Sequence, residues 1–141
     1  MRLCPVLAET AMAESKVTLE TLNELLFLWF PILKSPEYAR LVAGLDDGPY
    51  VIFGVIFNSY LENMVYSGHP EDWRNIGTFI ENLSTGGDEG VRELLKLEIL
   101  PTFLKSQRFI DTYWEHLGAN TRPALTWIAP KVAPQIQVPS S

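Results

Sequence analysis

The chain has 141 residues, a hydrophobic content of 47% and a formal net charge of −6 at pH 7. This length and hydrophobic content suit one folded domain with a substantial core, and they exclude an intrinsically disordered chain. The acidic balance argues against a nucleic-acid-binding protein, because neutralising phosphates requires an excess of Lys and Arg.

Compartment and membrane behaviour follow from the cysteine count and the apolar runs. Cys4 is the only cysteine, so an intrachain disulfide and a Cys-based metal site are excluded, and a reducing compartment is favoured. The longest apolar runs, 25–33 and 50–57, are far shorter than the ~20 residues that cross a bilayer as a helix. Pro5 and Glu9 interrupt the short apolar patch near the N-terminus, unlike in a signal peptide. We therefore expect a cytoplasmic protein with no membrane segment.

The chain divides into three parts. Residues 1–16 are expected to form a loose leader, residues 17–130 a helical domain, and residues 131–141 a flexible, proline-rich tail. Short connections between the predicted helices imply antiparallel neighbours. The predicted fold is an all-α, single-domain bundle of six or seven helices in antiparallel hairpins.

The first predicted helix runs from Thr18 to Leu33, where leucines recur at helical spacing. Pro31 is expected to kink or end it, because proline lacks the N–H that a helix interior needs. A second start follows at Ser35, with a capping hydroxyl, proline at the first helical position and an acid in the first turn. This short helix is predicted to end near Leu45.

Residues 50–66 are apolar on nearly every side of a helical wheel, which is typical of a central helix packed on several sides. A strand over YVIFGVIF is the alternative, because β-branched and aromatic residues dominate this run. Polar residues at helical spacing farther along favour the helix. The next helix is predicted to start at His69 and to end near Leu83.

The C-terminal half carries further boundary residues. Asp88 is predicted to cap a helix, and Pro101 to break or bend it. Another helix is expected from Ser106 to Leu117, with Gly118 as its stop. A last short turn should begin near residue 121 and include Trp127.

Catalytic and metal-binding patterns find little support in the sequence. The two histidines, His69 and His116, lack the Glu-x-x-His spacing of a helical di-iron site. Gly86-Gly87 is followed by Asp88 rather than by Lys and Ser or Thr, unlike in a phosphate-binding loop. No serine lies in a Gly-x-Ser-x-Gly elbow. We expect no catalytic residues and no cofactor or metal.

Two glutamates lie on apolar helices. Glu98 falls on the apolar face of its predicted helix, where an unpaired charge is costly, so we expect it to be buried and hydrogen-bonded. Glu62 lies near Asn58 on the one polar stripe of the 50–66 helix. The two could be structural locks that cap backbone groups or pair with an Arg such as Arg74 or Arg108. Alternatively, they could form a general acid/base pair.

Acidic residues outnumber basic ones most strongly in the middle of the chain. Between residues 35 and 87 there are seven acids against Arg40 and Arg74 alone. Such an asymmetry fits a docking face for a basic protein, since complementary fields steer association. The candidate partner-binding residues lie at three acidic turns: Asp46, Asp47, Glu71, Asp72, Asp88 and Glu89.

One resemblance to a known family covers residues 50–117. The pattern Phe79-Ile80-Glu81-x-Leu83, the acidic turn at Asp88, and then Val91-x-x-Leu94-Leu95-x-Leu97-Glu98-x-Leu100 resembles an uncharacterised family of small bacterial all-helical proteins. Members of this family tend to occur as immunity-type proteins beside polymorphic toxins. The resemblance implies a non-enzymatic protein that binds and blocks a cognate toxin.

Three functional hypotheses follow. The first is a bacterial immunity protein that neutralises a basic toxin through an acidic face. The second is a small helical enzyme or ligand binder with Glu62, Glu98 and His116 in an interior pocket. The third is a homo-oligomeric structural module, with Trp29, Trp114 and Trp127 at its interface.

Overall fold

The computed structural model describes residues 17–139, which form an all-α bundle around one hydrophobic core. This confirms the predicted fold class. The only β-type pairing among the described residues is an isolated parallel bridge between Val17 and Gly87. The expected leader, 1–16, lies outside the described residues. No helix in the described part is long and apolar enough to cross a membrane.

Two prolines, Pro31 and Pro36, begin the short segments that follow the first helix. Helix α2 (Leu19–Trp29) ends just before Pro31, as predicted, and the 3₁₀ segment η1 (Pro31–Lys34) follows. Helix α3 (Pro36–Ala39) is shorter than predicted, and turns occupy residues 40–48. Because α3 buries only Tyr38, it has no apolar stripe that would stabilise a longer helix.

The YVIFGVIF run is helical and not a strand. Helix α4 (Pro49–Val51), the π-helical segment η2 (Ile52–Phe57) and helix α5 (Asn58–Ser67) follow one another without a break. They are not buried on every side, however, because Val51 and Val55 are exposed. The apolar face of this helix is therefore wider than the core that it contacts.

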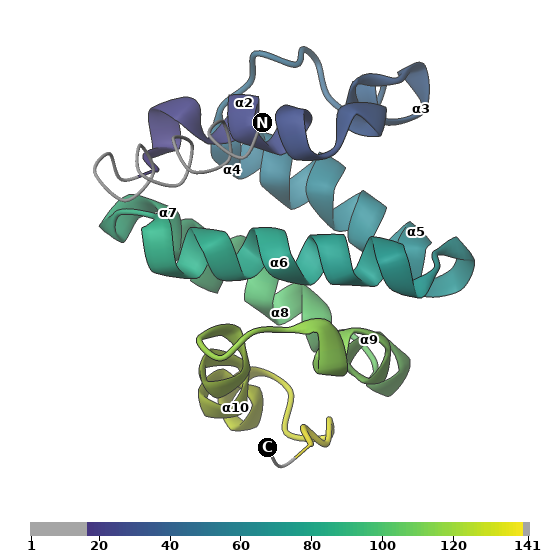
Figure 1. Ribbon diagram of the computed structural model, residues 1–141, viewed down its shortest axis with the longest axis vertical. Coiled ribbons are helices and arrows are strands. Elements are labelled where there is room, and N and C mark those ends of the chain that lie inside the picture. Colours follow the sequence, from purple (N-terminus) through teal and green to yellow (C-terminus); the bar gives the residue numbers. More distant parts are fainter. Residues whose placement is uncertain (1–16, 140–141) are drawn as a thin grey trace, which may run out of the picture.

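Helix α6 (Pro70–Gly86) crosses the middle of the molecule and runs antiparallel to α5 (Figure 1). It continues three residues beyond the predicted end at Leu83. The hydroxyls of Ser84 and Thr85 donate to backbone carbonyls one turn back, so polar residues are tolerated in this last turn. Because α6 lies in the middle of the molecule, it contacts elements from both halves of the chain.

After α6, the chain forms helix α7 (Glu89–Leu94), the π-helical segment η3 (Leu95–Ile99) and helix α8 (Leu100–Phe103). The cap predicted at Asp88 is confirmed, because its Oδ1 accepts a hydrogen bond from the Val91 N–H at 3.0 Å. Pro101 does not break the helix. It lies in the first turn of α8, directly after the π-helical turn that changes the backbone hydrogen-bond pattern.

The C-terminal part contains helix α9 (Gln107–Tyr113), the 3₁₀ segment η4 (Trp114–His116) and helix α10 (Thr121–Val132). Ser106, the predicted start of this helix, caps α9, because its Oγ accepts a hydrogen bond from the Phe109 N–H at 3.1 Å. The region around Trp127 is a twelve-residue helix and not a short turn. The expected domain boundary at residue 130 therefore falls inside α10.

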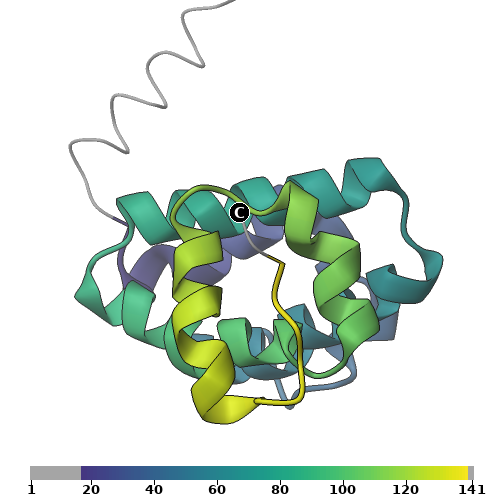
Figure 2. The ribbon, with the colours of Figure 1, turned by 90° about the horizontal axis from the view of Figure 1, so that it is seen from below.

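Residues 133–139 pack back onto α9 (Figure 2). The Gln107 side chain donates to the Gln137 carbonyl at 2.8 Å and accepts from the Gln137 N–H at 2.9 Å. Ile136 and Val138 are partly buried against the core. This segment thus contacts the domain and is not detached from it, in contrast to the tail expected from its prolines.

Aromatic rings connect α6 to the N-terminal helices. Phe79 lies in contact with four rings, at centroid distances between 5.3 and 6.3 Å, from Trp29, Phe30, Phe53 and Phe57. Edge-to-face and tilted pairs of this kind add to the energy of apolar burial. These aromatic rings therefore form part of the hydrophobic core.

Candidate functional site

The interior pocket proposed around Glu62, Glu98 and His116 does not form, because the three side chains lie in different environments. Glu62 is exposed and 3.5 Å from the Lys105 Nζ, each side chain being about half exposed. His116 lies in η4 against α6, with its ring 5.9 Å from the Trp73 ring. Its Nε2 is 3.9 Å from a carboxylate oxygen of Glu115.

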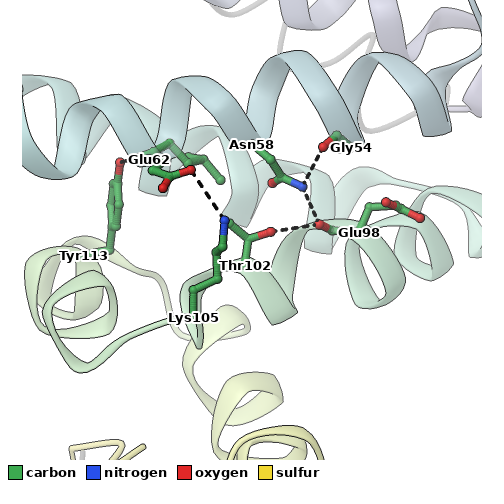
Figure 3. Close-up of polar contacts among 8 residues, drawn as sticks. Gly54, Asn58, Glu62, Glu98, Thr102, Lys105 and Tyr113 are labelled. Carbon is green, nitrogen blue, oxygen red and sulfur yellow. Dashed lines mark hydrogen bonds and ion pairs between the residues drawn. The ribbon is translucent and has the colours of Figure 1, made fainter.

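Glu98 contributes its backbone, not its carboxylate, to the polar contact between η2 and η3. The Asn58 side chain donates to the Glu98 carbonyl at 2.8 Å and to the Gly54 carbonyl at 3.2 Å, and the Thr102 hydroxyl also donates to the Glu98 carbonyl at 3.2 Å (Figure 3). These contacts join two π-helical segments that are far apart in the sequence.

The carboxylate of Glu98 lies over Gly54. A Cβ on Gly54 would be 2.8 Å from Glu98 Oε1, so a side chain at position 54 would require the Glu98 carboxylate to shift. Within residues 17–139 this carboxylate has no ion-pair or hydrogen-bond partner, and it is only partly buried. The expectation of a buried, hydrogen-bonded Glu98 side chain, paired with Arg74 or Arg108, is therefore wrong. Partial exposure lets water solvate the charge.

A different carboxylate, Glu81 on α6, is the most extensively hydrogen-bonded acid of the described part. It accepts from the backbone N–H groups of Asn120 and Thr121, from Asn120 Nδ2 at 2.6 Å and from Thr121 Oγ1 at 2.8 Å. These donors form the N-terminus of α10. Glu81 thus caps a helix thirty-nine residues away in sequence.

The environment of Glu81 affects its pKa in two opposing ways. Burial raises the pKa, but the hydrogen bonds from Asn120 and Thr121 outweigh that effect and hold the pKa below its ordinary value. Gly118 makes the contact possible, because a Cβ there would overlap the Glu81 carboxylate. Gly118 has a negative φ. Its role is therefore to leave space, and not the left-handed helix stop that the sequence suggested.

Within residues 17–139, two buried tyrosines also have displaced pKa values. Burial, together with the nearby charges of Asp72 and Tyr38, raises the pKa of Tyr60 to about 12. Burial also raises the pKa of Tyr113 far above its ordinary value, and the Tyr113 hydroxyl donates to the Leu61 carbonyl at 2.7 Å. Both phenols stay protonated near neutral pH, which suits structural hydrogen bonding and not general-base catalysis.

No group of three His, Cys, Asp or Glu side chains within residues 17–139 is arranged to hold a metal ion. His69 instead precedes α6, where its N–H donates to the Asp72 carboxylate at 3.0 Å. This contact is the reciprocal half of an N-terminal capping arrangement. The predicted partner-binding residue Asp72 therefore has a local structural role as well.

The structure separates the three acidic turns. Glu71 and Asp72 lie at the start of α6, whereas Asp88 and Glu89 follow its end. A seventeen-residue helix is about 25 Å long, so these two pairs are separated by the whole length of α6 (Figure 1).

Two of the three acidic turns, those at residues 46–47 and 88–89, border α2. Asn23 Nδ2 on α2 donates to the Asp47 carbonyl at 2.8 Å. At the other turn, Asp88 N–H donates to the Val17 carbonyl at 2.9 Å, just before α2 begins. We define the α2 acidic surface by the acids on and beside this helix. Its members are Glu20, Glu24, Asp46, Asp47, Asp88 and Glu89.

Within this surface the side chains differ in availability. Glu20, Glu24, Asp46 and Glu89 are exposed. Asp47 is partly buried, and the carboxylate of Asp88 is engaged in capping α7. The ion pairs of the described residues, Glu62–Lys105 and Glu115–His116, lie outside the α2 acidic surface. Glu20 and Glu24 were not singled out from the sequence, because their proximity to the 46–47 turn depends on tertiary packing.

The tryptophans predicted at an oligomer interface have unequal exposure. Trp114 is buried, and Trp29 is partly buried against Phe79. Only Trp127 among these three is largely exposed, at 63%. Two of the three are therefore part of the core or its edge.

Comparison with known proteins adds no family or function. No family model, no curated protein and no solved structure matches this chain. The resemblance over residues 50–117 consequently stays a prediction.

Proposed function

We propose that this chain is a non-enzymatic protein-binding module that binds a basic partner through the α2 acidic surface. The supporting observation is that exposed Glu20, Glu24, Asp46 and Glu89 have no cation within ion-pairing distance among residues 17–139. Unpaired surface charges of one sign accelerate the association of an oppositely charged protein. A partner with Lys and Arg would supply the cations for these pairs.

The kind of partner follows from the sequence resemblance. Immunity-type proteins block a cognate toxin, and a compact domain with an acidic surface suits that role. We therefore propose a bacterial, cytoplasmic immunity protein with a basic toxin domain as its partner. The pair Glu71–Asp72 lies at the far end of α6 and is outside this proposed interface.

The test uses two charge-reversal variants of equal net charge. The first replaces Glu20, Glu24 and Asp46 with Lys. The control replaces three exposed acids outside the α2 acidic surface, Glu37, Glu71 and Glu115, with Lys. Each chain is co-expressed with the product of its neighbouring gene, and growth is scored. Association rates of the purified pair are measured at two ionic strengths.

We expect the first variant to lose protection. Its association rate with the partner should fall about tenfold or more at low salt and should depend little on salt concentration. The control should protect as the wild type does. Full protection by the first variant, or equal loss in both variants, would overturn the acidic-surface proposal. Absence of any toxicity from the neighbouring product would overturn the immunity assignment.

A further inference from the structure

A second surface with the opposite charge lies between the end of α6, the α7–η3 helix and α10. It is a groove of about 430 Å³, within the size range of ligand-binding hollows. Its lining combines apolar and polar side chains: Ser84, Arg92, Leu95, Lys96, Leu100, Asn120, Ala124, Trp127 and Ile128. We refer to it as the α10 groove.

The basic side chains of the groove are unusual in a chain with a net charge of −6. Arg92 and Lys96 line it, and the Lys131 Nζ lies 3.6 Å from the centroid of the Trp127 ring at its edge. None of the three has a carboxylate partner within residues 17–139. Arg92 also donates to the Gly87 carbonyl at 2.7 Å, which fixes its position.

The acids nearest the groove do not neutralise these cations. Glu81 is close to Asn120, but its oxygens are occupied by donors at the start of α10. Glu89 and Glu93 are on α7, and both are exposed outside the lining. The groove therefore keeps a local positive charge.

Trp127 supplies the apolar part of a binding site. Tryptophan and arginine are enriched among the residues that contribute most to protein interfaces. The lining of the groove is mostly apolar, includes the exposed Trp127 and also carries basic side chains. Such a lining suits a segment that presents both an apolar side chain and a carboxylate. A hollow of this size takes the side chains of a short segment, whereas a domain-sized interface buries about 800 Å² on each side.

We propose that the α10 groove binds an acidic, amphipathic peptide segment of a second protein. The groove borders the α2 acidic surface at α7, which carries both Glu89 and Arg92, but it shares no residue with that surface. The chain would then hold one basic partner and one acidic segment at different places. Charge complementarity selects the acidic segment, since a basic one would meet Arg92, Lys96 and Lys131.

The experiment pans a displayed library of random peptides, each about a dozen residues long, against the immobilised full chain. The groove variant carries Trp127→Ala and Lys96→Glu, both at exposed positions. The control variant carries Tyr66→Ala and Arg40→Glu. Tyr66 is a matched aromatic residue, 64% exposed and with the Arg108 guanidinium 4.3 Å from its ring centroid.

Enriched peptides should contain Asp or Glu together with large apolar residues. Synthesised and measured by fluorescence polarisation, they should bind the groove variant about tenfold or more weakly and the control within about twofold of the wild type. Their affinity should fall as salt is raised. Circular dichroism checks that both variants fold, and Lys96→Glu alone replaces the double variant if the latter melts early.

Several results would overturn the proposal. They are the absence of enriched peptides, enrichment of neutral or basic peptides, and equal binding by the groove and control variants. Sedimentation velocity distinguishes a second copy of this chain as the occupant. Self-association that disappears with Lys96→Glu would assign the groove to a homo-oligomer instead. None of these results depends on the charge reversals at α2.

Discussion

At the scale of single residues, Glu81 accepts more hydrogen bonds than the acids that were singled out from the sequence, such as Asp72 and Asp88. Its carboxylate, on α6, accepts four donor groups from Asn120 and Thr121 at the start of α10. Nothing in the local sequence of Glu81 indicates this, because it lies at an ordinary position of an amphipathic helix and its donors are about forty residues away. Only tertiary packing brings the cap to its helix.

Glu81→Gln should destabilise the protein by about 1–2 kcal/mol at pH 7, from the lost charge at a helix N-terminus and weaker hydrogen bonds. Because the folded-state pKa of Glu81 is lowered, its contribution is present above the unfolded-state pKa and is lost as pH falls through the folded-state pKa. Urea unfolding at pH 7 and at acidic pH measures the loss of stability and its pH dependence. Exposed Glu93→Gln is the control, and an equal difference between wild type and Glu81→Gln at both pH values would contradict the charged cap.

Gly77 offers a second residue-scale prediction. A Cβ at this position would overlap the His116 carbonyl oxygen, where η4 packs on α6. Gly77→Ala should therefore destabilise by about 1–3 kcal/mol, as overpacking typically does. Gly48→Ala is the control, because a Cβ there would meet nothing within 4 Å and the φ of Gly48 is negative. Thermal melts that rank the two alike would show that η4 can move away.

At the scale of elements, helix starts were easier to predict than helix lengths. Asp88 caps its helix as expected, and Ser106 caps a helix at its predicted start, since a capping side chain acts on backbone groups two or three residues away. The lengths depended on contacts that no local pattern records. α3 stops early for lack of a buried face, and α10 continues through Pro130.

Pro101 illustrates the same limit. A proline in a helical pattern predicts a break, but the backbone instead widens into the π-helical segment η3 just before it. The side chains of Asn58 and Thr102 then both donate to the Glu98 carbonyl. Asn58 on the neighbouring helix thus donates to a carbonyl in the stretch before Pro101, where the regular α-helical hydrogen bonds are replaced by a π-helical pattern.

A double-mutant cycle tests this arrangement. Asn58→Ala and Thr102→Val each leave one side-chain donor to the Glu98 carbonyl, whereas the double variant leaves neither. We expect the double variant to lose about 1 kcal/mol more than the two single variants together. Equilibrium urea unfolding gives the three differences, with Thr126→Val as a control, since its exposed hydroxyl donates only within its own helix. Strict additivity would mean that the two donors act independently.

At the scale of the whole molecule, hydrophobic periodicity was sufficient for the all-α class and most of the core, because burial follows the apolar faces of the helices. The candidate sites were less predictable. Glu62, Glu98 and His116 are separated, and the acidic turns at Glu71 and Asp88 lie at opposite ends of α6. The α10 groove was missed because Arg92 and Lys96 come from a segment more than thirty residues before Trp127.

The segment after α10 provides a prediction for the whole fold. Removing residues 134–141 deletes the partly buried Ile136 and Val138 and the reciprocal hydrogen bonds between Gln137 and Gln107. The truncated chain should be less stable by about 1–3 kcal/mol, mainly through lost apolar burial. Differential scanning calorimetry of the truncated chain measures this, with exposed Gln135→Ala in the full chain as a control. An unchanged melting temperature would show that the segment contributes nothing to the core.

The bridge between Val17 and Gly87 has a practical consequence for how this protein is handled. It attaches the beginning of the described chain at the α6–α7 turn, next to Asp88, whereas the segment after α10 packs against α9 on the other side of α6 (Figure 1). A fluorophore, affinity handle or surface linkage placed directly before residue 17 would therefore lie close to the acids beside the α6–α7 turn. Anchoring through the C-terminus instead orients those acids toward the solution, so the choice of terminus decides which partner a captured molecule is able to meet.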